Sequence, residues 1–277
     1  MIAWDRLKIQ RMPWYAALRS SVERTEWRPE WPTLADYQHQ LDGLPQPILT
    51  ASGKSLRVVM QNADQCSDWR DAYEPRIYRQ GELQTRLENW HDCFNLLTWI
   101  SFPASKAVLN ARQYALLAAR AEAAEIGARS PRQDALTQFD ESGVIVLSSD
   151  PVLSNLLTGF QWKSLFWENR GEVNQKMRYF LFGHGLMERA LTPYRGLTGK
   201  GIILPVSERF FAETLATQLV QTDYLLAQYM ENRQHLMQPQ DLVPVPLLGI
   251  PGFSSENTQA EYYDDPRYFR PGRRFKG

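Results

Sequence analysis

The chain is organised around the stretch Arg86-Leu87-Glu88-Asn89-Trp90-His91-Asp92-Cys93-Phe94-Asn95-Leu96-Leu97-Thr98-Trp99-Ile100-Ser101-Phe102-Pro103, in which large aromatics surround several reactive polar groups. Asn89 is a favourable helix N-cap, and Asp92 then falls in the first turn, where a carboxylate faces the partial positive charge of the helix end. Apolar residues recur at helical spacing as far as Pro103, which ends the helix because it lacks a backbone N–H. The stretch therefore predicts a short, buried helix over residues 89–102.

One polar line follows this predicted helix, because His91, Asn95 and Thr98 are spaced i, i+4 and i+7. A functional interpretation makes His91 a general base or a metal ligand, with Asp92 or Asn95 beside it. The structural alternative makes Asp92 a capping residue and His91 a hydrogen-bonded residue at the edge of the core. Local capping already accounts for Asp92, so the sequence alone favours the structural alternative.

Four motifs carry a resemblance to a known family. The central stretch contains Asn89-Trp90-His91-Asp92, Phe94-Asn95, Phe102-Pro103, Lys106 and Asn110; the later motifs are Phe139-Asp140-Glu141-Ser142-Gly143-Val144, Phe182-Gly183-His184 and the terminal run from Tyr263 to Arg273. Together they resemble the bacterial family called domain of unknown function 3025 (DUF3025), over nearly the whole chain. Cys93 stands where the family pattern has an aromatic residue. The resemblance implies a family and no particular reaction.

Composition bounds the function classes. The chain has 277 residues, of which 43% are hydrophobic, 12% are aromatic and nine are tryptophans, so it can build a substantial core. Its formal net charge is zero, which argues against a general electrostatic nucleic-acid binder, because such proteins rely on many basic contacts. Nucleic acid is thus an unfavoured partner, although a local basic patch would still allow it.

The chain's two cysteines and its apolar runs exclude several classes. Cys66 and Cys93 form no CxxC pair, so neither a disulfide scaffold nor a zinc knuckle is indicated. The first residues contain no apolar signal segment, and no apolar run approaches the roughly 20 residues that span a bilayer. We therefore expect a soluble cytoplasmic protein without a membrane partner.

The order of predicted elements indicates the α+β class, mostly helical, with a small sheet, in a single domain over residues 1–277. It would consist of an N-terminal arm (1–32), a core (33–237) and a proline-rich, ordered tail (238–277) that wraps the core. Predicted strands cover 55–60, 143–147 and 202–205, and a hairpin covers 73–85 with its turn at Gln80-Gly81. Predicted helices cover 34–41, 105–126, 172–191 and 207–232, with short helices opened by Ser130-Pro131 and Asp150-Pro151.

The predicted helix 172–191 places His184 on its apolar face, with Glu188 one turn later. Gly183 and Gly185 flank this histidine, and glycine inside a helix costs about 0.8–1 kcal/mol relative to alanine. We expect the backbone there to press closely against another element. The glycine-rich run Gly196–Gly201 is not a phosphate loop, because its spacing is wrong and a strand follows it.

The residues of chemical interest fall into two groups. The first, which we expect to line a polar pocket between helices 89–102 and 172–191, contains His91, Asp92, Asp140, Glu141, His184 and Glu188. Two histidines with several carboxylates suit a divalent metal or a general acid–base pair. Turn chemistry before the strand at 143 accounts for Asp140 and Glu141 equally well. In this hypothesis His91, Asp92, Asp140 and His184 are catalytic, while Asn95 and Glu188 bind substrate.

The second group is the tail, where tyrosines alternate with arginines that include Arg270 and Arg273. Such a pattern suits stacking on bases and pairing with phosphates, which makes both arginines candidate substrate contacts. It suits docking of the tail on the protein itself better, with the acids of the tail pairing internally.

Three functions follow as hypotheses from these groups. The leading one is an enzyme with a His/Asp/Glu pocket, hydrolase-like, with or without a bound divalent metal. The second is a nucleic-acid-binding or nuclease-like protein; a hairpin followed by a helix bearing His91 and Asn95 faintly resembles the ββα-metal nucleases. The third is a non-catalytic protein in which both histidines only stabilise the core.

Overall fold

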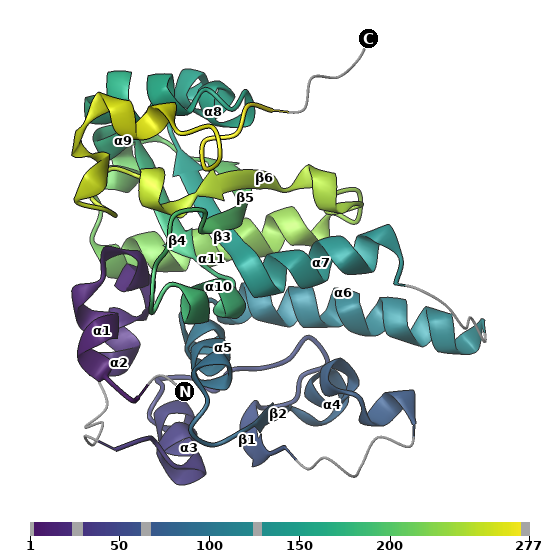
Figure 1. Cartoon of the computed structure of the whole chain (residues 1–277). Coiled ribbons are helices and arrows are strands. Elements are labelled where there is room, and N and C mark those ends of the chain that lie inside the picture. Colours follow the sequence, from purple (N-terminus) through teal and green to yellow (C-terminus); the bar gives the residue numbers. More distant parts are fainter. Residues whose placement is uncertain (1–2, 24–29, 62–67, 124–128, 273–277) are drawn as a thin grey trace.

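A mixed four-stranded sheet forms the centre of the protein (Figure 1). The structure is a computed structural model, and it describes residues 3–23, 30–61, 68–123 and 129–272. The strand order is β4-β3-β5-β6; β3 runs parallel to β5, and the two outer pairings are antiparallel. The strands of this sheet are β3 (Gly143–Ser148), β4 (Met177–Leu181), β5 (Thr198–Pro205) and β6 (Val243–Pro246). A smaller parallel pair is formed by β1 (Arg57–Met60) and β2 (Glu82–Thr85).

Helices surround both sheets, so the chain is α+β as the sequence predicted. Their bounds are α1 (Arg6–Arg11), α2 (Arg19–Glu23), α3 (Leu34–Asp42), α4 (Tyr73–Gln80), α5 (Trp90–Ser101), α6 (Pro103–Glu122), α7 (Pro131–Ser142), α8 (Pro151–Thr158), α9 (Arg170–Lys176), α10 (His184–Arg189) and α11 (Leu215–Glu231). No helix in the described ranges has the length and apolar character needed to cross a bilayer.

Strand β3 is apolar at consecutive positions because both of its faces are covered. Ile145 and Leu147 join the core built mainly by α6, α7 and α11. Val144 and Val146 join the other core, which includes residues of the N-terminal segment, α5, α8, α10 and the tail. The sheet therefore separates two hydrophobic cores. This explains why the sequence shows an unbroken apolar run at β3 instead of alternation.

Helix α5 starts and ends as its sequence predicts. The Asn89 side chain accepts a hydrogen bond from the backbone N–H of Asp92 at 3.1 Å, and the helix ends at Ser101. Pro103 opens α6 immediately afterwards, but Phe102 at the N-cap has no side chain that could accept a bond. Asp223 of α11 supplies the cap, since its carboxylate accepts from the backbone N–H groups of Ala104 and Ser105 at 2.9 and 2.8 Å.

The hairpin predicted over residues 73–85 is wrong. Residues Tyr73–Gln80 form α4, and β2 pairs in parallel with β1 across that helix. Pro75 is tolerated because it lies in the first turn, and Gly81, at φ 72°, ends the helix in the left-handed region. The glycine that indicated a hairpin turn is thus a helix C-cap. The ββα-metal arrangement loses its strand pair with this correction.

The long helix predicted over residues 172–191 is also wrong. The segment divides into α9, strand β4 and α10 (Figure 1). Met177–Leu181 pairs with β3, and both faces of β4 contact a core, so its apolar residues mimic a helical stripe. Sheet pairing overrode the helical pattern, as tertiary context often does.

The tail packs on the body, as expected. Tyr268 donates to the carbonyl of Leu197 at 2.9 Å, and Tyr263 donates to the carbonyl of Gly249 at 2.9 Å. Its aromatic residues Tyr262, Tyr263, Tyr268 and Phe269 are buried. In Figure 1 this yellow segment lies beside α8 and α9, away from α5.

Candidate metal centre

Helices α5 and α10 bring His91 and His184 together. His91 lies in the first turn of α5. His184 opens α10, shortly after the end of β4, and is a buried residue with 5% exposure. The two imidazole rings lie edge to face with their centroids 4.3 Å apart. Two histidines separated by more than ninety positions in the sequence therefore lie next to each other.

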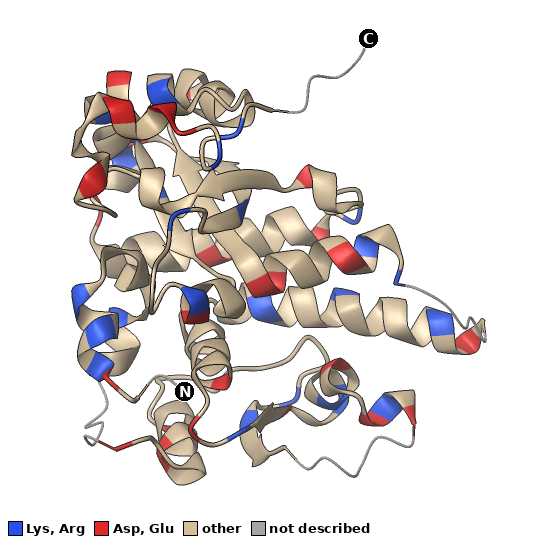
Figure 2. Cartoon of the chain, viewed as in Figure 1, with Lys and Arg blue, Asp and Glu red and all other residues tan. Residues whose placement is uncertain are grey.

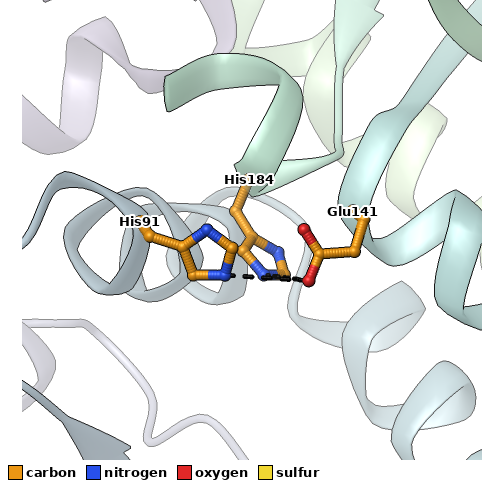
Figure 3. A group of neighbouring side chains, drawn as sticks. All are labelled: His91, Glu141 and His184. Carbon is orange, nitrogen blue, oxygen red and sulfur yellow. Dashed lines mark ion pairs between the residues drawn. The ribbon is translucent and has the colours of Figure 1, made fainter. Parts of the chain in front are cut away.

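Glu141, in the last turn of α7, completes the cluster (Figure 3). One of its oxygens, Oε1, lies 3.7 Å from Nε2 of His91 and 3.6 Å from Nε2 of His184. The three ligand-type atoms all lie within 4.8 Å of one another. Asp140 and Glu141 are thus helical residues instead of the turn residues that the sequence indicated.

The close packing of α10 against the end of α7 explains why glycines flank His184. A Cβ atom on Gly183 would collide with the backbone N of Gly143, and one on Gly185 would collide with the carboxylate of Glu141. The expectation of a tightly pressed backbone is confirmed, although Gly183 is a helix N-cap and not an interior residue.

Each imidazole also has a carboxylate on the side of its Nδ1 atom. Nδ1 of His91 lies 3.2 Å from Oε2 of Glu188, within hydrogen-bond distance. Nδ1 of His184 lies 3.9 Å from Oδ1 of Asp140, too far for a hydrogen bond, and this buried nitrogen has no hydrogen-bond partner among the described residues. Both rings therefore turn Nε2 toward Glu141 and Nδ1 toward another acid.

The surroundings of Glu141 favour its ionised form. The adjacent His184 imidazole, together with His91 and Lys106, lowers the pKa of Glu141 below its ordinary value despite partial burial. The carboxylate is therefore ionised at neutral pH, which is the form that binds a metal.

A second layer of polar residues lies beneath the histidines. Lys106 is 4% exposed and its Nζ lies 2.5 Å from Oδ1 of Asp140, between the rings of Trp99 and Phe182 at 5.6 and 5.9 Å. Asp140 therefore faces both Lys106 and His184, so this ion pair connects the core to the cluster.

Glu74 on α4 belongs to the same layer. It accepts a hydrogen bond from Nδ2 of Asn110 at 2.6 Å, while Oδ1 of Asn110 is buried without a partner among the described residues. Burial first, and then the negative charge of Asp140, raise the pKa of Glu74 to about 7. This carboxyl can therefore gain or lose a proton near neutral pH.

The other residues predicted for the pocket lie to one side of the cluster. Asp92 is engaged by Arg86, whose Nε and Nη2 donate to its two oxygens at 2.9 Å each and whose backbone N–H donates at 2.7 Å. Asn95 hydrogen-bonds the hydroxyl of Tyr73. Asp92 thus fixes the entry to α5, and Asn95 holds α4 against α5.

The predicted tail contacts lie elsewhere. Nε of Arg270 donates to the carbonyl of Arg267, and the carbonyl of Arg270 accepts from Trp162, so this residue anchors the tail. Arg273 lies outside the described residues. Acidic and basic residues intermingle along the ribbon in Figure 2, in keeping with the zero net charge.

Comparison with known protein families identifies the family of this chain. A model of the family described as protein of unknown function (DUF3025) matches residues 56–273, most of the sequence. The chain belongs to the DUF3025 family. Searches of curated proteins and of solved structures found no match. The resemblance carried by the sequence motifs is confirmed, and the DUF3025 match includes His91, Glu141, His184 and Glu188.

Sequence reasoning named Glu141 within the acidic group but did not select it as a site residue, and it missed Lys106, Glu74 and Asn110 as neighbours of the cluster. Two signals could have indicated them. Lys106 and Asn110 are polar residues one turn apart in an otherwise apolar part of α6, and both belong to the DUF3025 motif. Glu74, on a segment predicted as a hairpin, gave no such signal.

Proposed function

We propose that this protein binds a divalent transition metal, most simply Zn²⁺, through His91, His184 and Glu141, and that it is a metal-dependent hydrolase. The observation that carries the proposal is the convergence of two Nε2 atoms on one carboxylate oxygen, at 3.7 and 3.6 Å. Two imidazoles and one carboxylate are a common ligand set of catalytic zinc.

The spacing of the three donors supports a small ion. Zinc bonds of about 2.0–2.1 Å at tetrahedral angles place neighbouring donors about 3.3–3.4 Å apart. Oε1 of Glu141 lies a few tenths of an ångström farther than that from each Nε2, and the three ligand atoms lie within 4.8 Å of one another. Binding an ion would therefore require a side-chain adjustment, which Glu141 can make because its side chain is 44% exposed.

The backing carboxylates support the same assignment. Metal-bound histidines almost always give their second ring nitrogen to a carboxylate, carbonyl or water, which fixes the ring and the tautomer. Glu188 stands in that position for His91 at 3.2 Å. For His184 the nearest carboxylate on that side is Asp140, whose Oδ1 lies 3.9 Å from Nδ1, so a small side-chain movement would be needed for the same pairing.

Three protein ligands leave a fourth position for water or substrate, as in catalytic zinc sites. The ion would supply an activated water and a Lewis acid for hydrolysis. The chain's own contribution is orientation: Glu188 holds the His91 ring, and Lys106 holds Asp140 beside His184. Glu74 would be available to exchange a proton near neutral pH.

The proposal is tested first by metal content. Purified protein is analysed for metals, stripped with a chelator and titrated with Zn²⁺ by calorimetry. We expect one site per chain, lost in His184→Asn and Glu141→Gln and kept in His39→Asn, whose exposed histidine serves as the matched control. Absence of saturable binding, or equal loss in the His39 control, would refute the metal centre.

Activity is tested on the same variants. Esters, amides and phosphoesters are screened with the metal-loaded protein, and hydrolysis must disappear with the chelator and in both ligand variants. A metal-loaded protein that hydrolyses none of these substrates would contradict the hydrolase assignment while leaving the metal site in place.

Folding separates the site from a purely structural role for the histidines. If His184→Gln unfolds the chain, the imidazole is part of the scaffold; if the variant folds but loses the metal, the site is supported. The nucleic-acid alternative stays a prediction, checked by binding of a labelled oligonucleotide and its salt dependence. Location in the cytoplasm likewise stays a prediction, checked by cell fractionation.

A further inference from the structure

A cavity of about 490 Å³ lies against the edge strand β4, between the 3₁₀ segment Pro13–Leu18, the start of α11 and residues 250–253. Eleven of its sixteen lining residues are apolar or aromatic, among them Phe211 and Phe253, and the other five are polar or charged. A volume of this size is typical of sites for small molecules. The cavity contains none of the residues of the candidate metal centre.

Two arginines are among the residues that line this cavity. Nε of Arg178 and Nε of Arg19 are both buried and have no hydrogen-bond partner among the described residues. Arg19 keeps one contact, from Nη2 to the carbonyl of Met12 at 3.3 Å. Burial lowers the pKa of Arg178 below its ordinary value, and no neighbouring acid offsets that effect.

The acidic residue that lines the cavity already has another partner. Glu213 lines the cavity, but its carboxylate pairs with Arg209 at 3.3 Å. Within the described residues, neither Arg19 nor Arg178 takes part in an ion pair with a carboxylate. A partly buried guanidinium without an anion is unfavourable, because desolvation is not offset by a partner. An anion from outside the chain would supply that partner.

The cavity and the metal centre use different residues around β4. The cavity is lined by Met177–Phe180 of the strand, whereas His184 follows the last residue of the strand, Leu181, by three positions. None of the proposed metal ligands lines the cavity, so the two sites are distinct.

We propose that this cavity binds a small organic carboxylate with an apolar body, such as a medium-chain fatty acid. The guanidinium groups of Arg178 and Arg19 receive the carboxylate, since the planar fork of arginine matches it in two-point geometry. The apolar residues of the lining, which include Phe211 and Phe253, receive the apolar part. This binding is independent of the proposed hydrolase activity.

The test is calorimetric titration of the full chain with octanoate, and with octan-1-ol as the uncharged analogue of equal length. Octanoate is expected to bind one site per chain and the alcohol at least about tenfold more weakly. Arg178→Met is expected to weaken octanoate binding at least about tenfold, because loss of one partner of a buried charge pair is strongly unfavourable. Arg178→Lys, which keeps the charge but not the fork, should fall between them.

Controls make the result specific. Arg132→Met removes the same charge from an exposed position of α7 and should leave octanoate binding unchanged. Ala16→Phe fills the cavity from the opposite wall and should abolish binding while both arginines remain. His184→Asn, which removes a metal ligand, should bind octanoate like the wild type, so the two proposals fail separately.

Three outcomes would overturn the proposal. Octanoate and octan-1-ol binding equally would show that no carboxylate is recognised. Inorganic phosphate binding as tightly as octanoate would show that the apolar wall contributes nothing. Unchanged affinity in Arg178→Met, measured on protein whose folding is verified by circular dichroism, would remove the arginine from the site.

Discussion

The hydrogen bond between Glu188 and His91 allows the metal proposal to be tested quantitatively without removing a ligand. Glu188→Gln keeps the size of the side chain and removes the charge behind Nδ1, 3.2 Å away. Loss of such a backing group usually weakens metal affinity by about 10- to 100-fold. Because the Glu188 side chain is 43% exposed, the metal-free protein should lose less than about 0.5 kcal/mol of unfolding free energy.

The expected shift in melting temperature follows from linkage. Free Zn²⁺ at about 100 times the wild-type dissociation constant stabilises the wild type by about 2.7 kcal/mol. The same concentration stabilises a variant with 10- to 100-fold weaker affinity by only about 1.4 to 0.4 kcal/mol. The difference of about 1.3–2.3 kcal/mol corresponds to about 3–9 °C in a domain of this size.

The assay is thermal unfolding of wild type and Glu188→Gln, each with chelator and with buffered Zn²⁺. Glu261→Gln is the matched control, because Glu261 is an exposed acid of the tail. We expect the two variants to melt together in chelator and to separate in zinc. If zinc raises the melting temperatures of both variants equally, the carboxylate–histidine argument for the centre is refuted.

Three further predictions test the surroundings of the centre. Lys106→Met should lower the free energy of unfolding by about 3–5 kcal/mol in urea denaturation, because it leaves Asp140 buried and unpaired; a loss below about 1 kcal/mol would contradict the ion pair's structural role. Gly185→Ala should weaken zinc affinity roughly tenfold in calorimetry, because its Cβ displaces the Glu141 carboxylate, while the gain in helix propensity keeps the protein folded; unaltered affinity would mean that Glu141 does not bind. Burial raises the folded-state pKa of Glu74 from 4.5 to about 7, so the folded state holds this proton more tightly and stability should fall as pH rises between those values. Urea denaturation in chelator at pH 5 and 7.5 should show a smaller fall for Glu74→Gln than for wild type, and equal falls would remove Glu74 as the source.

The sequence by itself determined several helix starts, because these depend on residues only a few positions apart. The N-caps at Asn89, Ser130 and Asp150 were predicted from the sequence, and each accepts the expected backbone hydrogen bond. The apolar run of β3 was likewise readable as a strand. These features need no information from distant parts of the chain.

Only the tertiary structure decided which residues form the site. Strand β4 exists because β3 offers a pairing edge, and that pairing, not the helical pattern of the sequence, carries His184 to the start of α10. The sequence supplied both histidines and listed Glu141 among several acids, but spacing cannot tell which acid a ring will face. The structure turns Asp92 to Arg86 and Glu141 to the imidazoles, since backbone pairing and close glycine contacts fix directions that no local pattern encodes.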